Sequence, residues 1–449
     1  MVKDRAIRIQ LFALVAAGIV LAGCSDSTPS IGGTPVQEIS VIANQPVEPV
    51  TLVQVAQNDW PWWRGPNGNG IARSPQPPLK WTASKNVIWE VPVPGRGHSS
   101  PTVVGNYVYL ATADEKQQIQ SVLCFERETG RQVWKKDLHR GGFPGSVHSR
   151  NTHASCTMAC DGKRLFVAFL NGNAIWATAL DLDGEQVWQK KLGGFDSEYG
   201  YPSSPAIHQS LVIFAADHRA GGYLAALHRK TGKIRWLKKR PEVSTCSSPV
   251  IAHVAVQAQL LISGADHVMS YDPQTGDVNW SVEGAGRLTC GTMVAAGDLV
   301  FASGGYPSKE TICVRGDGSE EVVWRNRQKI YVPSMLVHNG YLYAVQDDGI
   351  VFCWNAKTGQ EAWKKRLTGD VSASPILVGG HIYVVNERGK LFVFQANPQK
   401  FQLVAENQLG DEAFATPAIC GGRIFIRVAD HSTGTRQEML YCIGIDDAE

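Results

Sequence analysis

From about residue 86 onward, the chain alternates short apolar runs with turns that contain Gly or Asp. The runs at 107–110 and 381–385 are examples, and both are rich in β-branched and aromatic residues. Runs of this length and composition, bounded by turn residues, are typical of β-strands rather than of helices. The pattern predicts an all-β fold for this part of the chain.

Two sequence markers repeat along the same region at intervals of about 44 residues. The first marker is Thr-Gly or Asp-Gly with a Trp after three further residues, or after five in one stretched copy. Two more members are assigned from their position in the repeat, namely Trp89 and Val404, which stands where an eighth Trp would be. The second is a small residue followed by Pro, as at Ser204-Pro205, together with degenerate copies. Each marker occurs eight times. The tryptophans of the first marker are Trp89, Trp134, Trp188, Trp236, Trp280, Trp324 and Trp363.

A unit of about 44 residues with four short strands has the size of a propeller blade. We therefore predict an eight-bladed β-propeller with four antiparallel strands in each blade. The Gly is expected to form the turn between the third and fourth strands, and the Trp to pack between neighbouring blades. Because the last unit stops after its third strand, the strand around Trp89 is expected to complete it. The ring would then be closed by pairing of the N- and C-terminal strands.

The N-terminus has the features of an export signal. Lys3, Arg5 and Arg8 precede an apolar run at 11–23, which is too short to cross a bilayer as a helix. The run ends in small residues before Cys24, which resembles the lipobox of bacterial lipoproteins, where the Cys carries the lipid. An ordinary signal peptide with an incidental Cys is the alternative.

The chain is expected to divide into four parts: a lipoprotein signal peptide at 1–23, a flexible tether at 24–58, an aromatic N-terminal cap segment at 59–85 and the propeller at 86–449. The aromatic run at 60–63 is expected to pack on the propeller rather than to form a carbohydrate platform. Ser25, and not Asp, follows the Cys, which resembles lipoproteins sent to the outer membrane. We expect a periplasm-facing outer-membrane anchor, with the inner membrane or the cell surface as alternatives.

The composition excludes some classes of partner. Lys and Arg total 43 and Asp and Glu total 41, so the formal net charge is only +2. Binding to a polyanion requires a clustered excess of basic residues, so no nucleic-acid partner is expected. The chain is 43% hydrophobic, which is ample for a large core, and we expect a monomeric propeller.

The repeated Asp-x-x-Thr-Gly-x-x-x-Trp pattern resembles the tryptophan-docking repeat of PQQ-like (quinoprotein alcohol dehydrogenase-like) propellers. The likeness covers about residues 86–446. Together with the lipobox, the chain resembles the BamB-like lipoproteins of outer-membrane protein assembly. The resemblance implies a lipid-anchored, non-catalytic scaffold that contacts envelope protein partners.

The resemblance does not extend to the quinone site. PQQ dehydrogenases of this fold carry an adjacent Cys-Cys pair and acidic and Asn ligands for calcium, and this chain has no Cys-Cys. The Asp of the repeat is kept at Asp272 but is replaced in five other units, by Glu126, His228, Arg315, Asn355 and Gln395. We expect no catalytic residue, no metal and no cofactor. The alternative is a PQQ- or metal-dependent oxidoreductase that uses the mouth of the axial channel.

The cysteines are expected to be mostly unpaired, although one disulfide stays open, with Cys156 and Cys160 as the nearest pair. Third-strand positions favour buried thiols that act as small apolar groups. These positions hold Cys124, Cys313, Cys353 and Cys442, whereas Cys156, Cys246 and Cys290 lie at or just before the second marker.

The histidines are denser near the first two units. His98 precedes one marker, and His148, Arg150 and His153 precede the next, within the longest interval between repeat tryptophans. Segments that enter innermost strands gather at one mouth of the channel. We predict that His98, Arg150 and His153 line one pocket for a small anion or a metal. Solvated loop residues are the alternative.

Overall fold

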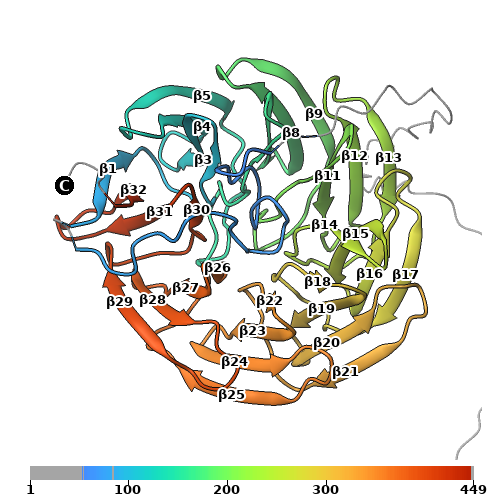
Figure 1. Ribbon diagram of the computed structural model, residues 1–449. Coiled ribbons are helices and arrows are strands. Elements are labelled where there is room, and N and C mark those ends of the chain that lie inside the picture. Colours follow the sequence, from blue (N-terminus) through green and yellow to red (C-terminus); the bar gives the residue numbers. More distant parts are fainter. Residues whose placement is uncertain (1–52, 54, 83–84, 446–449) are drawn as a thin grey trace, which may run out of the picture. The chain divides into compact units, whose positions relative to one another are not determined.

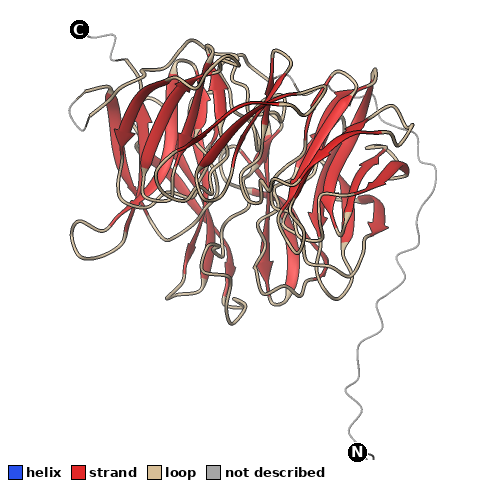
Figure 2. Ribbon diagram, turned by 90° about the horizontal axis from the view of Figure 1, so that it is seen from below, coloured by secondary structure: helices blue, strands red, loops and turns tan. Residues whose placement is uncertain are grey.

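The computed structural model of the protein describes residues 53, 55–82 and 85–445. The expected signal peptide, Cys24 and nearly all of the tether lie outside these ranges. In this part of the chain every regular element is a β-strand, and the strands form eight four-stranded sheets around a central axis (Figure 1, Figure 2). The predicted all-β, eight-bladed propeller is confirmed. Among the same residues, no helix has the length and apolar character needed to span a membrane.

The blades are numbered here in chain order, and each lists its strands from the axis outward. The first four are β2 (Thr102–Val104), β3 (Tyr107–Asp114), β4 (Ile119–Glu126) and β5 (Gln132–Arg140); β6 (Ala159–Cys160), β7 (Arg164–Asn171), β8 (Ala174–Asp181) and β9 (Gln186–Gly194); β10 (Ala206–His208), β11 (Leu211–Ala216), β12 (Tyr223–His228) and β13 (Ile234–Lys239); and β14 (Val250–Val254), β15 (Gln257–Gly264), β16 (His267–Tyr271) and β17 (Val278–Glu283). The last four are β18 (Val294–Ala296), β19 (Leu299–Gly304), β20 (Glu310–Arg315) and β21 (Val322–Asn326); β22 (Leu336–His338), β23 (Tyr341–Val345), β24 (Ile350–Asn355) and β25 (Glu361–Arg366); β26 (Ile376–Val378), β27 (His381–Val385), β28 (Lys390–Gln395) and β29 (Leu403–Gln408); and β30 (Ala418–Cys420), β31 (Arg423–Asp430), β32 (Gln437–Ile443) and β1 (Val87–Val93).

The ring closes in blade 8, where the two ends of the chain share one sheet. β1 pairs antiparallel with β32, and Trp89 lies opposite Cys442 in the register. The first strand of the propeller is therefore the outer strand of its last blade, as the position of Trp89 predicted. Closing the ring in this way leaves no blade short of a strand.

The burial pattern explains why the middle strands have no alternation in sequence. In β4 seven consecutive residues are buried, because both faces of each sheet pack against a neighbouring blade. In the outer strand β17 only Trp280 and Val282 are buried, and the other residues are exposed or intermediate. Continuous apolar runs thus mark the middle of a blade, and mixed runs mark its outer edge.

The repeated Gly and Trp meet between blades rather than within one. The indole of Trp188 in blade 2 donates its Nε1 proton to the carbonyl of Arg229 in blade 3, at 2.9 Å. Its ring lies against Gly232, where a Cβ would come within 2.7 Å of the indole. Gly232 has a φ of +68°, so the turn and the close approach of the ring both require glycine. Equivalent indole–carbonyl bonds are made by Trp89, Trp134, Trp236, Trp324 and Trp363.

Two members of the repeat depart from this arrangement for structural reasons. The turn of blade 5 is longer, and Trp280 reaches it through Gln259, whose Oε1 accepts from the indole and whose Nε2 donates to the carbonyl of Gly316. In blade 7 the position of the Trp is taken by Val404. The next blade, blade 8, has β32 as its third strand and β1 as its fourth, and these two strands come from opposite ends of the chain. With no continuous turn at that edge, there is no glycine for an indole to contact.

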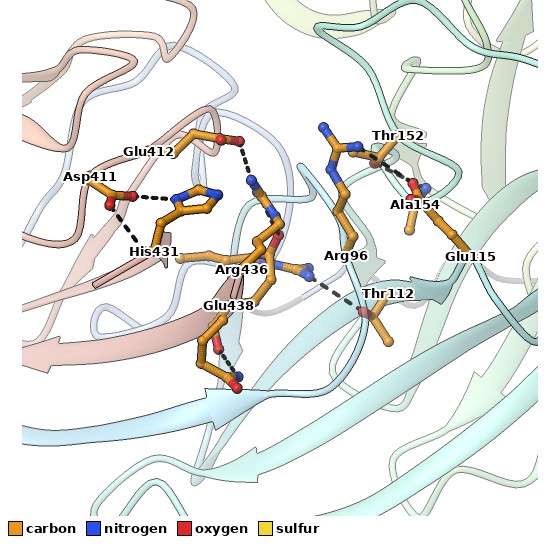
Figure 3. A network of polar contacts seen from close by, with 12 residues as sticks. Arg96, Thr112, Glu115, Thr152, Ala154, Asp411, Glu412, His431, Arg436 and Glu438 are labelled. Carbon is orange, nitrogen blue, oxygen red and sulfur yellow. Dashed lines mark hydrogen bonds and ion pairs between the residues drawn. The ribbon is translucent and has the colours of Figure 1, made fainter. Parts of the chain in front are cut away.

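The seam between blades 8 and 1 is held by a charged network (Figure 3). Arg427 of β31 donates to the carbonyl of Ala111 in blade 1 and pairs with Glu438 at 2.6 Å, and both charged side chains are buried. Arg436 pairs with Glu438 and with Glu412, which extends the network toward the surface. Since breaking a buried pair leaves an uncompensated charge, this network fixes the closing seam in one arrangement.

We expect Trp236→Ala to lower the free energy of unfolding by about 3–5 kcal/mol, because it removes a large side chain that is 6% exposed and leaves a cavity between blades 3 and 4. Urea unfolding followed by fluorescence or circular dichroism measures the change. Trp62→Ala, at a half-buried position of the N-terminal segment, is the control and should cost less. Equal losses for the two variants would contradict the packing role assigned to the repeat.

Candidate functional site

The second sequence marker forms a ring of hydroxyl groups around the axis. The backbone N–H of Ser100 in the entry to blade 1 donates to Oγ1 of Thr157 at the entry to blade 2, at 2.9 Å. Thr157 repeats the contact with Ser204, and so on around the ring. Each link of this kind joins two neighbouring blades. The eight members are Ser100, Thr157, Ser204, Ser248, Thr292, Ser334, Ser374 and Thr416.

Six of the eight possible links are present among the described residues, and two seams differ. Between blades 4 and 5, Oγ1 of Thr292 accepts instead from Nε1 of Trp63, at 2.7 Å. Between blades 8 and 1, Oγ of Ser100 is buried and has no hydrogen-bond partner.

Trp63 belongs to the N-terminal segment, which fills part of the axial channel. Trp60 exchanges backbone hydrogen bonds with Val103 of β2, at 2.8 and 2.9 Å. Arg64 is 1% exposed and donates to the carbonyls of Pro375 and Met335 in the entries to blades 7 and 6. Burial lowers the pKa of Arg64 to about 9. The segment thus contacts inner strands on several sides of the ring and acts as a plug.

A cavity of about 260 Å³ lies at the mouth of the axial channel, next to Trp63 of the N-terminal segment. The wall of this cavity follows the same eightfold repeat as the hydroxyl ring. Each blade contributes the residue that lies two positions before its Ser or Thr of the hydroxyl ring. This second ring consists of His98, Ser155, Pro202, Cys246, Cys290, Val332, Ser372 and Phe414. Trp63 forms part of the wall, and His148, Arg150, Asn151, Tyr199 and Tyr331 complete the rim. We call this cavity the axial pocket.

His98 presents an unpaired nitrogen in the axial pocket. Its ring stacks on Phe414 with centroids 4.4 Å apart, and Nε2 is buried with no partner. Burial, followed by the positive charges of Arg96, Arg427 and Arg436, holds the pKa of His98 well below its usual value. The imidazole is therefore neutral at pH 7 and offers polarity without charge.

Arg150 lines the same pocket, but its charge is already compensated. Its Nη2 lies 2.8 Å from Oδ2 of Asp370 and 3.4 Å from Oε2 of Glu387, at the edge of blade 7. The segment that carries Arg150 therefore crosses the mouth from blade 2 to blade 7. With Arg150 paired and His98 neutral, the pocket has little attraction for a small anion.

The structure brings together His98, His148 and Arg150, but it places His153 elsewhere. His153 lines a separate small cavity and packs against Phe143, with ring centroids 4.3 Å apart. The prediction that His98, Arg150 and His153 share one pocket is thus wrong for His153. The backbones are adjacent all the same, because the N–H of His98 donates to the carbonyl of Ala154. The difference lies in the side chain of His153, whose ring packs on Phe143.

Sequence reasoning placed Cys246 and Cys290 near the axis but did not assign them to a site. All nine cysteines of the described residues are free, including Cys156 and Cys160, and seven of them are buried. Only Cys246 and Cys290 among these nine are partly exposed, and both line the axial pocket. Their shared position, two residues before the hydroxyl of the repeat, is the signal that could have identified them.

The axial pocket does not fit the quinone and calcium chemistry of the resembled dehydrogenases. No Asp or Glu is among the residues that line it, so calcium would find no carboxylate ligand there. Within the described ranges, no group of three or more His, Cys, Asp or Glu side chains is arranged to hold a metal ion. The pocket instead combines neutral hydroxyls, aromatic rings, two thiols and one unpaired imidazole nitrogen.

These features define a class of protein, the PQQ-like propeller, in which indole–glycine contacts join the blades of a ring around an axial channel. The chain belongs to the family described as outer membrane protein assembly factor BamB, which matches residues 118–365 and 317–409.

Individual relatives agree with the fold and differ in what they are named for. The chain is 23% identical to BamB of Yersinia pestis over 80% of its own length and 90% of that protein. It is 24% identical to a tetrathionate hydrolase of Acidithiobacillus ferrooxidans over 67% of its length, and it spans 65% of that relative.

Solved structures show the same fold at low identity. The structure of BamB from Moraxella catarrhalis superposes with a TM-score of 0.57 at 13% identity, covering 79% of this chain and 99% of that one. A quinohemoprotein alcohol dehydrogenase from Comamonas testosteroni gives 0.61 at 12% identity, covering 86% and 80%. The fold is therefore shared by proteins with and without "dehydrogenase" in their names, and function has to be argued from the site.

The depressed pKa of His98 predicts a loss of stability in mild acid. Unfolding restores its usual pKa of about 6.5, so below that pH the unfolded state binds a proton that the folded state does not. The folded state should lose up to about 1.4 kcal/mol per pH unit from this residue as the pH falls from about 6.5. His98→Gln should reduce the difference between urea unfolding at pH 7 and pH 5. His148→Gln, at the exposed rim, should leave the difference as in wild type; an unchanged profile in His98→Gln would refute the assignment.

Proposed function

We propose that the protein is a lipid-anchored, non-catalytic scaffold that binds envelope proteins and takes part in outer-membrane protein assembly. The family match is the observation that carries the proposal. It is supported by the 90% coverage of BamB from Yersinia pestis, a protein named as an outer membrane protein assembly factor.

The architecture suits a scaffold. Indole–glycine contacts and the hydroxyl ring join the blades. The N-terminal segment fills part of the axial channel, which a propeller enzyme would use for its cofactor. A rigid ring can hold the loops at its two rims in fixed relative positions for a protein partner. Periplasmic placement, with a lipid on Cys24 as the anchor, would bring these loops close to the membrane.

The competing proposal is a PQQ- or metal-dependent oxidoreductase that uses the channel mouth. It would require ligands that the residues lining the axial pocket do not supply. Absorbance and metal analysis of protein purified from its native membrane separates the two proposals. Stoichiometric quinone or calcium would favour the enzyme and overturn the non-catalytic scaffold.

The anchor is tested by Cys24→Ser in the full chain, expressed in a Gram-negative host. We expect the protein to move from the membrane to the soluble fraction, or to accumulate with its signal peptide uncleaved, because the lipid acceptor is lost. Ser25→Ala keeps the Cys and is the matched control, which should stay membrane-bound. If Cys24→Ser is processed normally and remains in the membrane, the lipid anchor is wrong.

The partner is tested separately by crosslinking in intact cells, followed by capture of the wild-type chain from membranes. We expect crosslinks to outer-membrane assembly proteins, and these should weaken in the Cys24→Ser variant because it no longer lies at the membrane. Membrane-anchored protein that yields no crosslink to the assembly machinery would contradict the assembly role while leaving the anchor intact.

A further inference from the structure

Two of the nine described cysteines differ from the others in residue exposure and in position. Cys246 and Cys290 are partly exposed and line the axial pocket, whereas the remaining seven are buried. Burial raises the pKa of Cys156 and of Cys160 to about 12, so these neighbours stay protonated inside the core. A reagent that enters the axial pocket would therefore meet only Cys246 and Cys290 among the described thiols.

The two thiols occupy the same position in neighbouring blades. Cys246 leads into β14 of blade 4 and Cys290 into β18 of blade 5. The backbone N–H of Cys246 donates to the carbonyl of Thr289 at 2.8 Å, and Oγ of Ser247 donates to the carbonyl of Gly291 at 3.2 Å. The two segments therefore run side by side, at the spacing of paired strands, which lies within the Cα separations that disulfides bridge.

The side chains interact as well as the backbones. Hydrogen bonding to the Cys246 thiol, followed by burial, raises the pKa of Cys290 well above its usual value. Cys290 thus keeps its proton at neutral pH, and the first nucleophilic attack on an incoming reagent falls to Cys246. A nucleophile with a second thiol beside it is the arrangement that permits intramolecular exchange.

The pair also lies across a seam with an altered link. Between blades 4 and 5 the hydroxyl of Thr292 accepts from the indole of Trp63 instead of from the backbone of Ser248. Six other seams carry the regular link. A covalent bond two residues earlier would join the same two blades directly at this seam.

We propose that Cys246 and Cys290 form a reversible redox pair at the channel mouth, oxidised by a low-molecular-weight disulfide. The Cys246 thiolate attacks one sulfur of the reagent, forming a mixed disulfide and releasing one thiolate of the reagent. Cys290 then loses its proton and attacks Sγ of Cys246, which forms the Cys246–Cys290 bond and releases the second reagent thiolate. Two protein thiols are oxidised, one reagent disulfide is reduced to two thiols, and two protons leave the protein.

The inference is independent of the scaffold proposal, because it depends only on the pocket and on the register of two blades. Oxidation would convert two thiols in the pocket wall into an apolar bridge and would crosslink blade 4 to blade 5. The pair thereby couples the thiol–disulfide state of the surroundings to the shape of the axial pocket.

The test uses the full chain, reduced, freed of reductant and incubated with glutathione disulfide at pH 8. Remaining thiols are then blocked, and the protein is digested with trypsin without reduction. Arg287 separates the two cysteines, so they lie on different peptides, each with a single Cys. We expect a linked pair of peptides in the mass spectrum that disappears after treatment with dithiothreitol. The crosslink should also raise the Tm relative to the reduced protein.

Variants make the test specific. Cys290→Ser should trap glutathione on Cys246, because the second thiol is missing, and Cys246→Ser should react much more slowly at Cys290. Cys313→Ser removes a buried thiol of blade 5 and should leave the linked peptides unchanged. Thermal unfolding shows whether each variant is folded. Separate glutathione adducts on both cysteines of the wild type, or no reaction of either in the folded protein, would overturn the proposal.

Discussion

The contact between an indole and the glycine of the next blade is the interaction on which the ring depends. A propeller sheet is apolar on both faces, so it is stable only when both neighbours are in place. The Trp188–Gly232 contact fixes that placement at the outer edge, because the ring fits only over a residue without a Cβ and its Nε1 needs the adjacent carbonyl. Sequence periodicity is visible for this reason: the repeated residues are those that touch the next blade.

The hydroxyl ring performs the corresponding role near the axis. One side-chain oxygen and one backbone N–H per blade form the link, so Ser and Thr are interchangeable there, as at Ser100 and Thr157. The two contact circles, outer and inner, constrain the angle between neighbouring blades. Where the outer contact changes, a substitute is present, as when Gln259 carries the bond of Trp280 to Gly316. At the closing seam the outer contact is regular, since Trp89 donates to the carbonyl of Arg127, and the inner link at Ser100 is the one that is missing. There Arg427 of blade 8, which is paired with Glu438, donates to the carbonyl of Ala111 in blade 1.

This arrangement explains which features could be predicted from the sequence. Blade number, strand number and ring closure follow from counting contacts that recur, so Trp89 and Val404 could be placed without a structure. The path of the long segment at 141–158 could not, because nothing in it repeats. The path of this segment depends on a turn at Asn151 and on the ion pair between Arg150 and Asp370, two residues that are more than 200 positions apart. His98 does lie beside this segment, since its N–H donates to the carbonyl of Ala154, but the ring of His153 packs on Phe143 and not in the axial pocket.

The thiol pair shows that the repeat contains site information as well as fold information. Once the hydroxyl position is known in each blade, the residue two places earlier must face the axis at the same level, and eight such residues form the pocket wall. Six of these eight residues carry no thiol, and the other two, in the neighbouring blades 4 and 5, are cysteines. The plug matters to them because Trp63 closes one side of the pocket and redirects Thr292 away from the ring. Cys246 and Cys290 lie in this wall, where a small molecule that enters the axial pocket meets them.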